Sequence, residues 1–154
     1  MGCFCNSENK FRFEDKGINE KHQHMLVFSD ASMRNSPNFI CNCCGKAFQN
    51  ISCFYCLSCN YNMCKECFDY SGGIKLNVYK DGQVGSINRH SQHKMVYGKS
   101  KSKTTEKFND KKVYVCKICN GKFLLDYIRC WTCTEGDFDA CDRCFNETGG
   151  KIIN

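Results

Sequence analysis

The stretch CNCCGKAFQNISCFYCLSCNYNMCKEC, residues 41–67, decides the fold of this 154-residue chain. It holds three Cys-x2-Cys pairs, and two intervening residues let both sulfurs of a pair converge on one point, as half of a tetrahedral zinc site requires. The pairs are Cys41 with Cys44, Cys56 with Cys59, and Cys64 with Cys67. Four sulfurs complete one site and two remain, so two further ligands must come from histidines. This spacing predicts a cross-braced module with two zinc ions.

Composition indicates metal rather than disulfides. The chain has 16 cysteines, and cysteine-dense chains usually replace part of the hydrophobic core by cross-links. No apolar segment of the secretory kind precedes them, and no run approaches the roughly 18 apolar residues of a membrane span. We therefore expect a reducing, cytoplasmic compartment and zinc. Four bound ions would lower the formal charge from +6 to +2, so net charge says little about partners.

The second half of the chain repeats the first. The three pairs of the first half recur at offsets of 74–77 residues as Cys116, Cys119, Cys130, Cys133, Cys141 and Cys144. Eleven residues separate Cys44 from Cys56, and ten separate Cys119 from Cys130, so the spacing selects Cys56 over Cys53 as a ligand. Cys43 and Cys53 then lack counterparts and are expected to be buried or half-buried thiols.

The histidines recur as well, as His22-x-His24 and His90-x2-His93, and they allow two arrangements. In a His-first arrangement each pair precedes its own cysteines and four complete sites result. The sites are His22, His24, Cys56, Cys59; Cys41, Cys44, Cys64, Cys67; His90, His93, Cys130, Cys133; and Cys116, Cys119, Cys141, Cys144. In a His-last arrangement His90 and His93 join Cys56 and Cys59, His22 and His24 turn to Cys3 and Cys5, and Cys130 and Cys133 are orphaned. Ligand counting favours the His-first arrangement and four Zn²⁺ ions.

The fold class expected is a small zinc-stabilised α+β protein of two tandem cross-braced, treble-clef-like modules with short hairpins and a short C-terminal helix each. We predict a strand after His22, a hairpin over Lys46–Tyr55, and helices after Cys64 and Cys141 that end at the Gly-Gly pairs. The expected organisation is an N-terminal extension over 1–21, module 1 over 22–73, a linker over 74–89 and module 2 over 90–150.

A lysine-rich stretch lies inside the second module. Residues 98–112 hold six lysines against one glutamate and one aspartate, which predicts a mobile basic loop. It could contact an acidic lipid, nucleic acid or protein tail, but a solvated insertion is favoured because only Phe108 is interleaved with the lysines.

The pattern His22-x-His24-x-Leu26, Cys41-x2-Cys44 and Tyr55-Cys56-x2-Cys59-Asn60-Tyr61 resembles the cysteine- and histidine-rich domains related to the diacylglycerol-binding zinc domain. It also resembles the ZZ-type zinc finger in its last knuckle. Both resemblances imply a treble-clef-like fold with interleaved zinc sites, over about residues 22–67 and 90–144. Where the first family usually has histidine, this chain has Cys64 and Cys141. In ZZ domains the histidines follow the cysteines, and none follows Cys144 here.

What the resemblance implies for binding is limited by these departures. The segment FQNISCFY lacks the glycine pair of the lipid-binding groove, which argues against diacylglycerol binding. ZZ domains read peptides through an acidic cleft, for which Asp137 and Asp139 are candidates, although a solvated loop is the favoured role for both.

The N-terminal sequence Met-Gly-Cys-Phe-Cys resembles dual-acylation sites, with Gly2 as the myristoylation position and Cys3 and Cys5 as palmitoylation positions. Asn6 departs from the serine or threonine preferred there. Acylation is the one route by which we would expect peripheral membrane association.

Function is expected to be non-catalytic. All four histidines are assigned as zinc ligands, so none is left to act as a general base. A zinc ion with four protein ligands also has no open position for water. A RING-like ubiquitin ligase module is an alternative, but no histidine lies between Cys41 and Cys67. A nucleic-acid-binding or membrane-anchored zinc-finger adaptor is another, but the predicted helices carry more acids than bases. We expect a zinc-stabilised module for protein–protein interaction or structural support, as a small component of a larger assembly.

Overall fold

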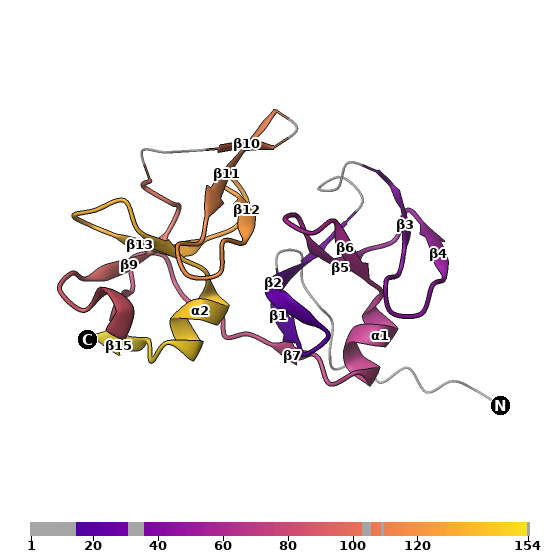
Figure 1. The fold of residues 1–154 in the computed structure, drawn as a ribbon, viewed down its shortest axis with the longest axis horizontal. Coiled ribbons are helices and arrows are strands. Elements are labelled where there is room, and N and C mark those ends of the chain that lie inside the picture. The colour runs from indigo at the N-terminus through magenta and orange to yellow at the C-terminus, as the bar shows by residue number, and fades with distance from the viewer. Residues whose placement is uncertain (1–14, 31–35, 103–105, 109, 154) are drawn as a thin grey trace.

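The computed structural model describes residues 15–30, 36–102, 106–108 and 110–153. It consists mostly of strands with a few short helices, gathered in two similar units that lie side by side (Figure 1). The described residues up to Lys75 form module 1, and those from Val84 onward form module 2. The candidate acylation positions Gly2, Cys3 and Cys5 lie outside the described residues.

Module 1 is built on a five-stranded antiparallel sheet of order β6-β5-β2-β1-β7, with β3 and β4 paired separately. Its elements are β1 (Lys16–Asn19), β2 (His22–Ser29), β3 (Asn38–Ile40), β4 (Ala47–Gln49), β5 (Cys53–Cys56), β6 (Tyr61–Met63), α1 (Lys65–Tyr70) and β7 (Ile74–Lys75). The strand expected after His22 is confirmed as β2. The hairpin expected over Lys46–Tyr55 is wrong, because β4 pairs with β3 whereas β5 pairs with β2 and β6.

Module 2 repeats this plan with a sheet of order β14-β13-β9-β8-β15 and a three-stranded sheet of order β10-β11-β12. Its elements are β8 (Val84–Ser86), the 3₁₀ helix η2 (Asn88–His90), β9 (Met95–Gly98), β10 (Glu106–Phe108), β11 (Lys111–Val115), β12 (Lys122–Leu124), β13 (Cys130–Cys133), β14 (Asp139–Ala140), α2 (Asp142–Glu147) and β15 (Lys151–Ile153). Part of the expected basic loop is therefore strand, since β10 pairs with β11. Strands β1, β7 and β8 lie in stretches expected to be an extension and a linker.

In the core of each module, an aromatic ring of a strand stacks closely on a phenylalanine of the helix. Phe54 and Phe68 stack in module 1 with centroids 3.6 Å apart, and Trp131 and Phe145 stack in module 2 at 3.8 Å. A glycine of the neighbouring strand faces each pair. A Cβ at Gly17 would lie 2.5 Å from the Phe68 ring, and one at Gly85 would lie 2.8 Å from both rings of its pair. The sheet can approach the ring pair only because these positions carry no side chain.

Both helices end as the Gly-Gly pairs predict. Gly72 and Gly149 have a φ of +76°, the left-handed conformation that glycine adopts without strain. The amide of the following glycine then donates to the carbonyl of Phe68 in α1 and of Phe145 in α2, at 2.8 Å in both.

The two modules share a packed interface, and β2 lies at its centre with side chains in contact with both modules. Leu26 of this strand lies in the core of module 1, whereas Met25 and Val27 pack with Tyr114 and Phe123 of module 2. Both faces of β2 are thus buried, which accounts for its continuous apolar run MLVF rather than a strict alternation.

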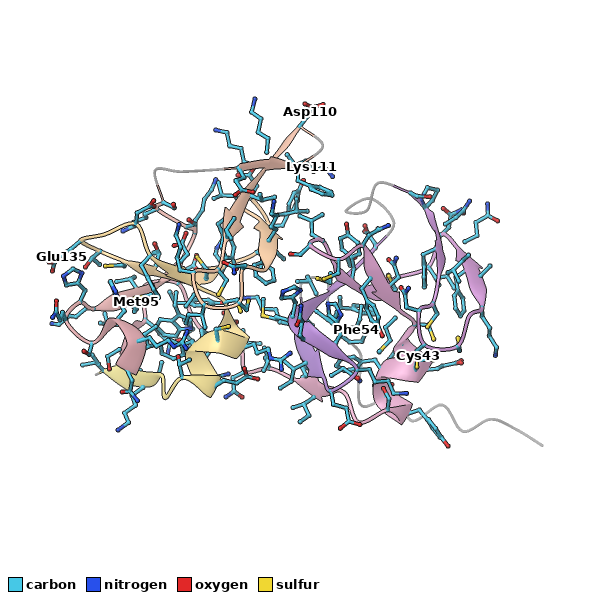
Figure 2. The ribbon with its side chains drawn as sticks, in the orientation of Figure 1. Cys43, Phe54, Met95, Asp110, Lys111 and Glu135 are labelled. Carbon is cyan, nitrogen blue, oxygen red and sulfur yellow. The ribbon has the colours of Figure 1, made fainter. Side chains whose placement is uncertain are left out.

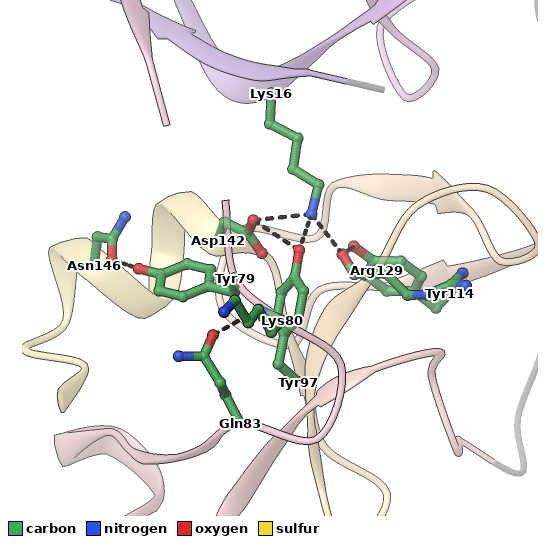
Figure 3. A network of polar contacts seen from close by, with 9 residues as sticks. All are labelled: Lys16, Tyr79, Lys80, Gln83, Tyr97, Tyr114, Arg129, Asp142 and Asn146. Atoms are coloured by element: carbon green, nitrogen blue, oxygen red, sulfur yellow. Dashed lines mark hydrogen bonds and ion pairs between the residues drawn. The ribbon is translucent and has the colours of Figure 1, made fainter. Parts of the chain in front are cut away.

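Lys16 reaches across this interface from β1 into module 2 (Figure 3). Its ammonium donates to the Asp142 carboxylate at 2.8 Å, to the Arg129 carbonyl at 3.0 Å and to the Tyr97 hydroxyl at 2.5 Å. Three acceptors satisfy its three protons. Burial raises the pKa of Asp142, and Lys16 opposes that shift. This buried charge pair therefore joins β1 of module 1 to α2 of module 2.

Candidate metal centres

Four groups of cysteine and histidine side chains could each hold a metal ion. Within each group the candidate ligand atoms lie within 4.8 Å of one another. The groups are His22, His24, Cys56, Cys59; Cys41, Cys44, Cys64, Cys67; Cys116, Cys119, Cys141, Cys144; and His90, His93, Cys133. The first two alternate along the sequence, as a cross-braced module requires. The described residues bring His22 and His24 to Cys56 and Cys59, as the His-first arrangement has it.

The ligand atoms lie about as close together as the ligands of one tetrahedral ion, within about 0.2 Å of the ideal separations. Bonds of about 2.0–2.3 Å place neighbouring ligands about 3.3–3.8 Å apart. The Nδ1 atom of His24 lies 3.1 Å from the Cys59 sulfur and 3.7 Å from the Cys56 sulfur. In module 2 the Cys119 and Cys141 sulfurs are 3.9 Å apart.

The tautomer of His24 follows from its other nitrogen. Nε2 lies 3.2 Å from the carbonyl oxygen of Cys119 in the other module, and a carbonyl can only accept. Nε2 therefore carries the proton, and Nδ1 turns its lone pair toward the two cysteine sulfurs. An outer partner that fixes the tautomer of a ligating histidine is common in metal sites, and here it also joins the two modules.

The first histidine of each pair, His22 or His90, has Nε2 available for a metal ion, whereas His24 has Nδ1. Among the described residues, Nε2 of His22 and Nε2 of His90 are buried polar atoms without a hydrogen-bond partner. Burial, with His24 as a second cause, lowers the pKa of His22 to about 4, so that the ring is neutral at pH 7. A buried, neutral and unpartnered imidazole nitrogen fits a metal ligand.

The rings of these two histidines are held in the same way in both modules. His22 stacks on Tyr61 with centroids 4.3 Å apart, and His90 stacks on Phe138 at 4.4 Å. Tyr61 and Phe138 precede their final cysteine pairs by the same interval, so the repeat extends to the supports of the ligands.

Backbone amides stabilise the sulfurs of the all-cysteine groups. The amide of Cys64 donates to the Cys41 sulfur at 3.3 Å, and the amide of Cys141 donates to the Cys116 sulfur at 3.4 Å. These donors favour the thiolate, which is the form that binds metal. They also tie the first residue before each helix to the knuckle that precedes β4 or β12.

Cys130 does not lie with His90 and His93, contrary to the sequence-based assignment. It occupies the first position of β13, and its sulfur donates to Asp139 at 3.7 Å. Cys53 holds the same position in β5, and its sulfur donates to Asn62 at 3.7 Å. Cys53 and Cys130 are thus counterparts, and both are buried thiols outside the metal groups.

The misassignment came from matching cysteines by loop length. The segments from Cys53 to Gly73 and from Cys130 to Gly150 align without a gap at an offset of 77 residues. Under that alignment Cys133 matches Cys56, and Gly136 matches Cys59. The loop between the first knuckle and this strand is two residues longer in module 2, which shifted the cysteine spacing. The constant offset was the signal that could have found the equivalence.

Asp137 and Asp139, the candidates for a peptide-reading cleft, lie in different environments. Asp139 is buried in β14 and accepts a hydrogen bond from the Ser100 hydroxyl at 2.5 Å, so it does not lie in a solvated loop either. Burial raises its pKa. Asp137 is exposed and accepts from Ser102. Asp139 therefore supports the β13–β14 hairpin rather than a binding cleft.

The 14 described cysteines are all free of disulfide bonds, in keeping with metal binding. Among the described residues no helix is long and apolar enough to cross a membrane. No protein-family model matches the chain, and neither a characterised protein nor a solved structure shows significant similarity to it.

Proposed function

We propose that this chain is a non-catalytic zinc protein whose two modules are folded around four Zn²⁺ ions and present a surface to a protein partner. The observation that carries the metal part is the interleaving of sulfur and imidazole ligands within single groups. Sets of four thiolates, or two thiolates and two imidazoles, are typical of structural zinc. The resemblance to tandem cysteine- and histidine-rich domains and to ZZ fingers supports the same assignment.

A structural role for zinc suits the ligand count. Three of the four groups supply four ligands each, so an ion in any of these three has no coordination position for a reacting water. Each module is short, with a core built from a few short strands and one short helix. Zinc contributes about 10–16 kcal/mol of apparent binding free energy in small zinc modules, so it is the dominant stabilising term here.

A groove on module 1 supports the interaction part of the proposal. It has a volume of about 720 Å³ and is lined by residues of β3, β4 and β6, including Phe39, Ile40, Phe48 and Asn62. Ile40 is 63% exposed. Amide side chains beside apolar ones on a short strand pair offer both hydrogen bonds and contact area to an extended peptide.

The test is affinity purification of the tagged full chain, comparing the wild type with Ile40→Asp and Ile74→Asp. Ile74 is a matched control, because it is 60% exposed on β7 and does not line the groove. We expect Ile40→Asp to lose specific proteins that Ile74→Asp retains, with zinc content unchanged in both. Equal retention of all partners by both variants would contradict a role for the groove.

A further inference from the structure

The His90–His93–Cys133 group has one ligand fewer than its counterpart in module 1. The missing ligand corresponds to Cys59, and the gapless alignment of the two modules puts Gly136 at that position. Cys130, the other cysteine near in sequence, is engaged with Asp139 at the far end of β13. Within the described part of the chain, no fourth cysteine, histidine or carboxylate joins the group.

The three ligands present are nevertheless arranged as in module 1. Nδ1 of His93 lies 3.4 Å from the Cys133 sulfur, matching the approach of His24 to its cysteines. Nε2 of His90 is buried and unpartnered, like that of His22. The site is thus built for a metal ion, although it is one donor short.

Glu135 lies nearby but on the wrong side of the ring to be the fourth ligand. Its carboxylate is 3.9 Å from Nε2 of His93, whereas Nδ1 is the nitrogen that faces Cys133. This is the side on which His24 meets the Cys119 carbonyl in module 1. Glu135 is therefore not placed as the fourth ligand, and it stands at the exposed edge of the molecule (Figure 2).

There is space for a donor where the cysteine is missing. A Cβ built on Gly136 would meet only the Cys133 sulfur, at 3.7 Å, an ordinary contact distance. His90 and His93 are both partly exposed and Gly136 is exposed, so the position that corresponds to Cys59 lies at the surface. A cysteine side chain would fit at position 136, where the sequence has glycine.

We propose that the zinc ion held by His90, His93 and Cys133 keeps one coordination position open to an exogenous thiolate. The proposal rests on the zinc binding proposed above. In the free protein water fills the position. A small thiol then replaces it, forming the metal–sulfur bond and releasing the water and one proton. A thiolate is the ligand expected because it restores the two-sulfur, two-imidazole set of module 1.

The test uses the full chain loaded with Co²⁺ in place of zinc, since cobalt–thiolate bonds give a charge-transfer absorption. Titration with a small thiol should increase that absorption in the wild type, while its S-methylated analogue should have no effect. Gly136→Cys should show the higher absorption from the start and no response to thiol. Cys130→Ser should respond as the wild type does.

Metal release gives a second readout. One of the four ions should pass to a competing chelator at a concentration at least about tenfold lower than the rest, because losing an outer partner alone already costs 10–100-fold in affinity. Gly136→Cys should remove this weak step. A wild type that ignores thiol, or a Gly136→Cys variant that still responds, would overturn the proposal. If the proposed zinc binding itself were wrong, no cobalt–thiolate absorption would appear at all.

Discussion

Lys16 and Asp142 form a charge pair that is nearly removed from solvent, with side chains 10% and 1% exposed. Replacing Lys16 by methionine would leave the Asp142 carboxylate buried without its cation. Breaking a buried pair in this way costs about 3–5 kcal/mol. We therefore predict that Lys16→Met lowers the free energy of unfolding by about that amount, measured by urea denaturation of the zinc-loaded protein.

Lys65→Met is the matched control for this prediction. Lys65 pairs with Asp69 on the surface of α1, where both side chains are nearly half exposed, at the same 2.8 Å distance. Exposed pairs of this type contribute about 0.3–0.5 kcal/mol. Equal losses in the two variants would show that Lys16 does not stabilise the interface through its charge.

Replacing a cysteine should release zinc only where that cysteine belongs to a metal group. Cys64 belongs to a metal group, whereas the Cys53 sulfur donates to Asn62 outside every group. We predict that Cys64→Ser loses one zinc ion per chain and much of the structure of module 1. Cys53→Ser should retain all the zinc bound by the wild type. Loss of zinc in both variants, measured by elemental analysis, would mean that the ligand assignment has the wrong register.

Five of the six Cys-x2-Cys pairs that spacing selects lie within one metal group each, because two intervening residues let both sulfurs converge on one point. Which strand position a cysteine occupies depends on loop length, which the fold tolerates freely. Cys130 was misassigned for that reason. The tautomers of the histidines were also beyond prediction, since the partner of His24 is a carbonyl 95 residues away in sequence.

At the scale of elements, the close approach of β8 to the Trp131–Phe145 pair depends on Gly85. A methyl group there would lie 2.8 Å from both rings and 3.1 Å from the Lys151 carbonyl oxygen. Overpacking of this kind costs about 1–3 kcal/mol. Gly85→Ala should therefore lower the urea midpoint clearly. Gly98→Ala, at the end of β9 with no atom within 4 Å of its Cβ, should change stability by less than about 0.5 kcal/mol. Similar effects of the two changes would contradict the packing argument.

The helices and the strand after His22 are predictable because their signals are local. Each helix lies between a ligand cysteine and a Gly-Gly pair, and the strand carries the apolar run MLVF. The partner of β4 is not predictable in this way. Residues 46–55 have the composition of a hairpin. In the structure, however, β5 pairs with β2, and all four residues of β5 are buried there. Sheet order is decided by such non-local burial, and a window of ten residues does not contain it.

At the scale of the whole molecule, the two modules pack against each other and are not independent domains joined by a linker. Val113 and Leu124 of module 2 pack in the core of module 1, and Arg143 of α2 donates to the backbone carbonyl of His22 at 3.0 Å. The sequence repeat predicts two modules, but it carries no information on how they meet, because the contacts differ on the two sides.

The central claim is that metal ions hold this fold together, and chelation tests it most directly. Trp131, the single tryptophan, is fully buried against Phe145 and reports on the core of module 2. Zinc per chain, tryptophan fluorescence and circular dichroism should be followed together while excess chelator is added at neutral pH under reducing conditions. The account predicts about four zinc ions at the start, and a red-shifted, unfolded spectrum once they are removed. A protein that has demonstrably lost its zinc but keeps its fluorescence and circular dichroism would contradict it.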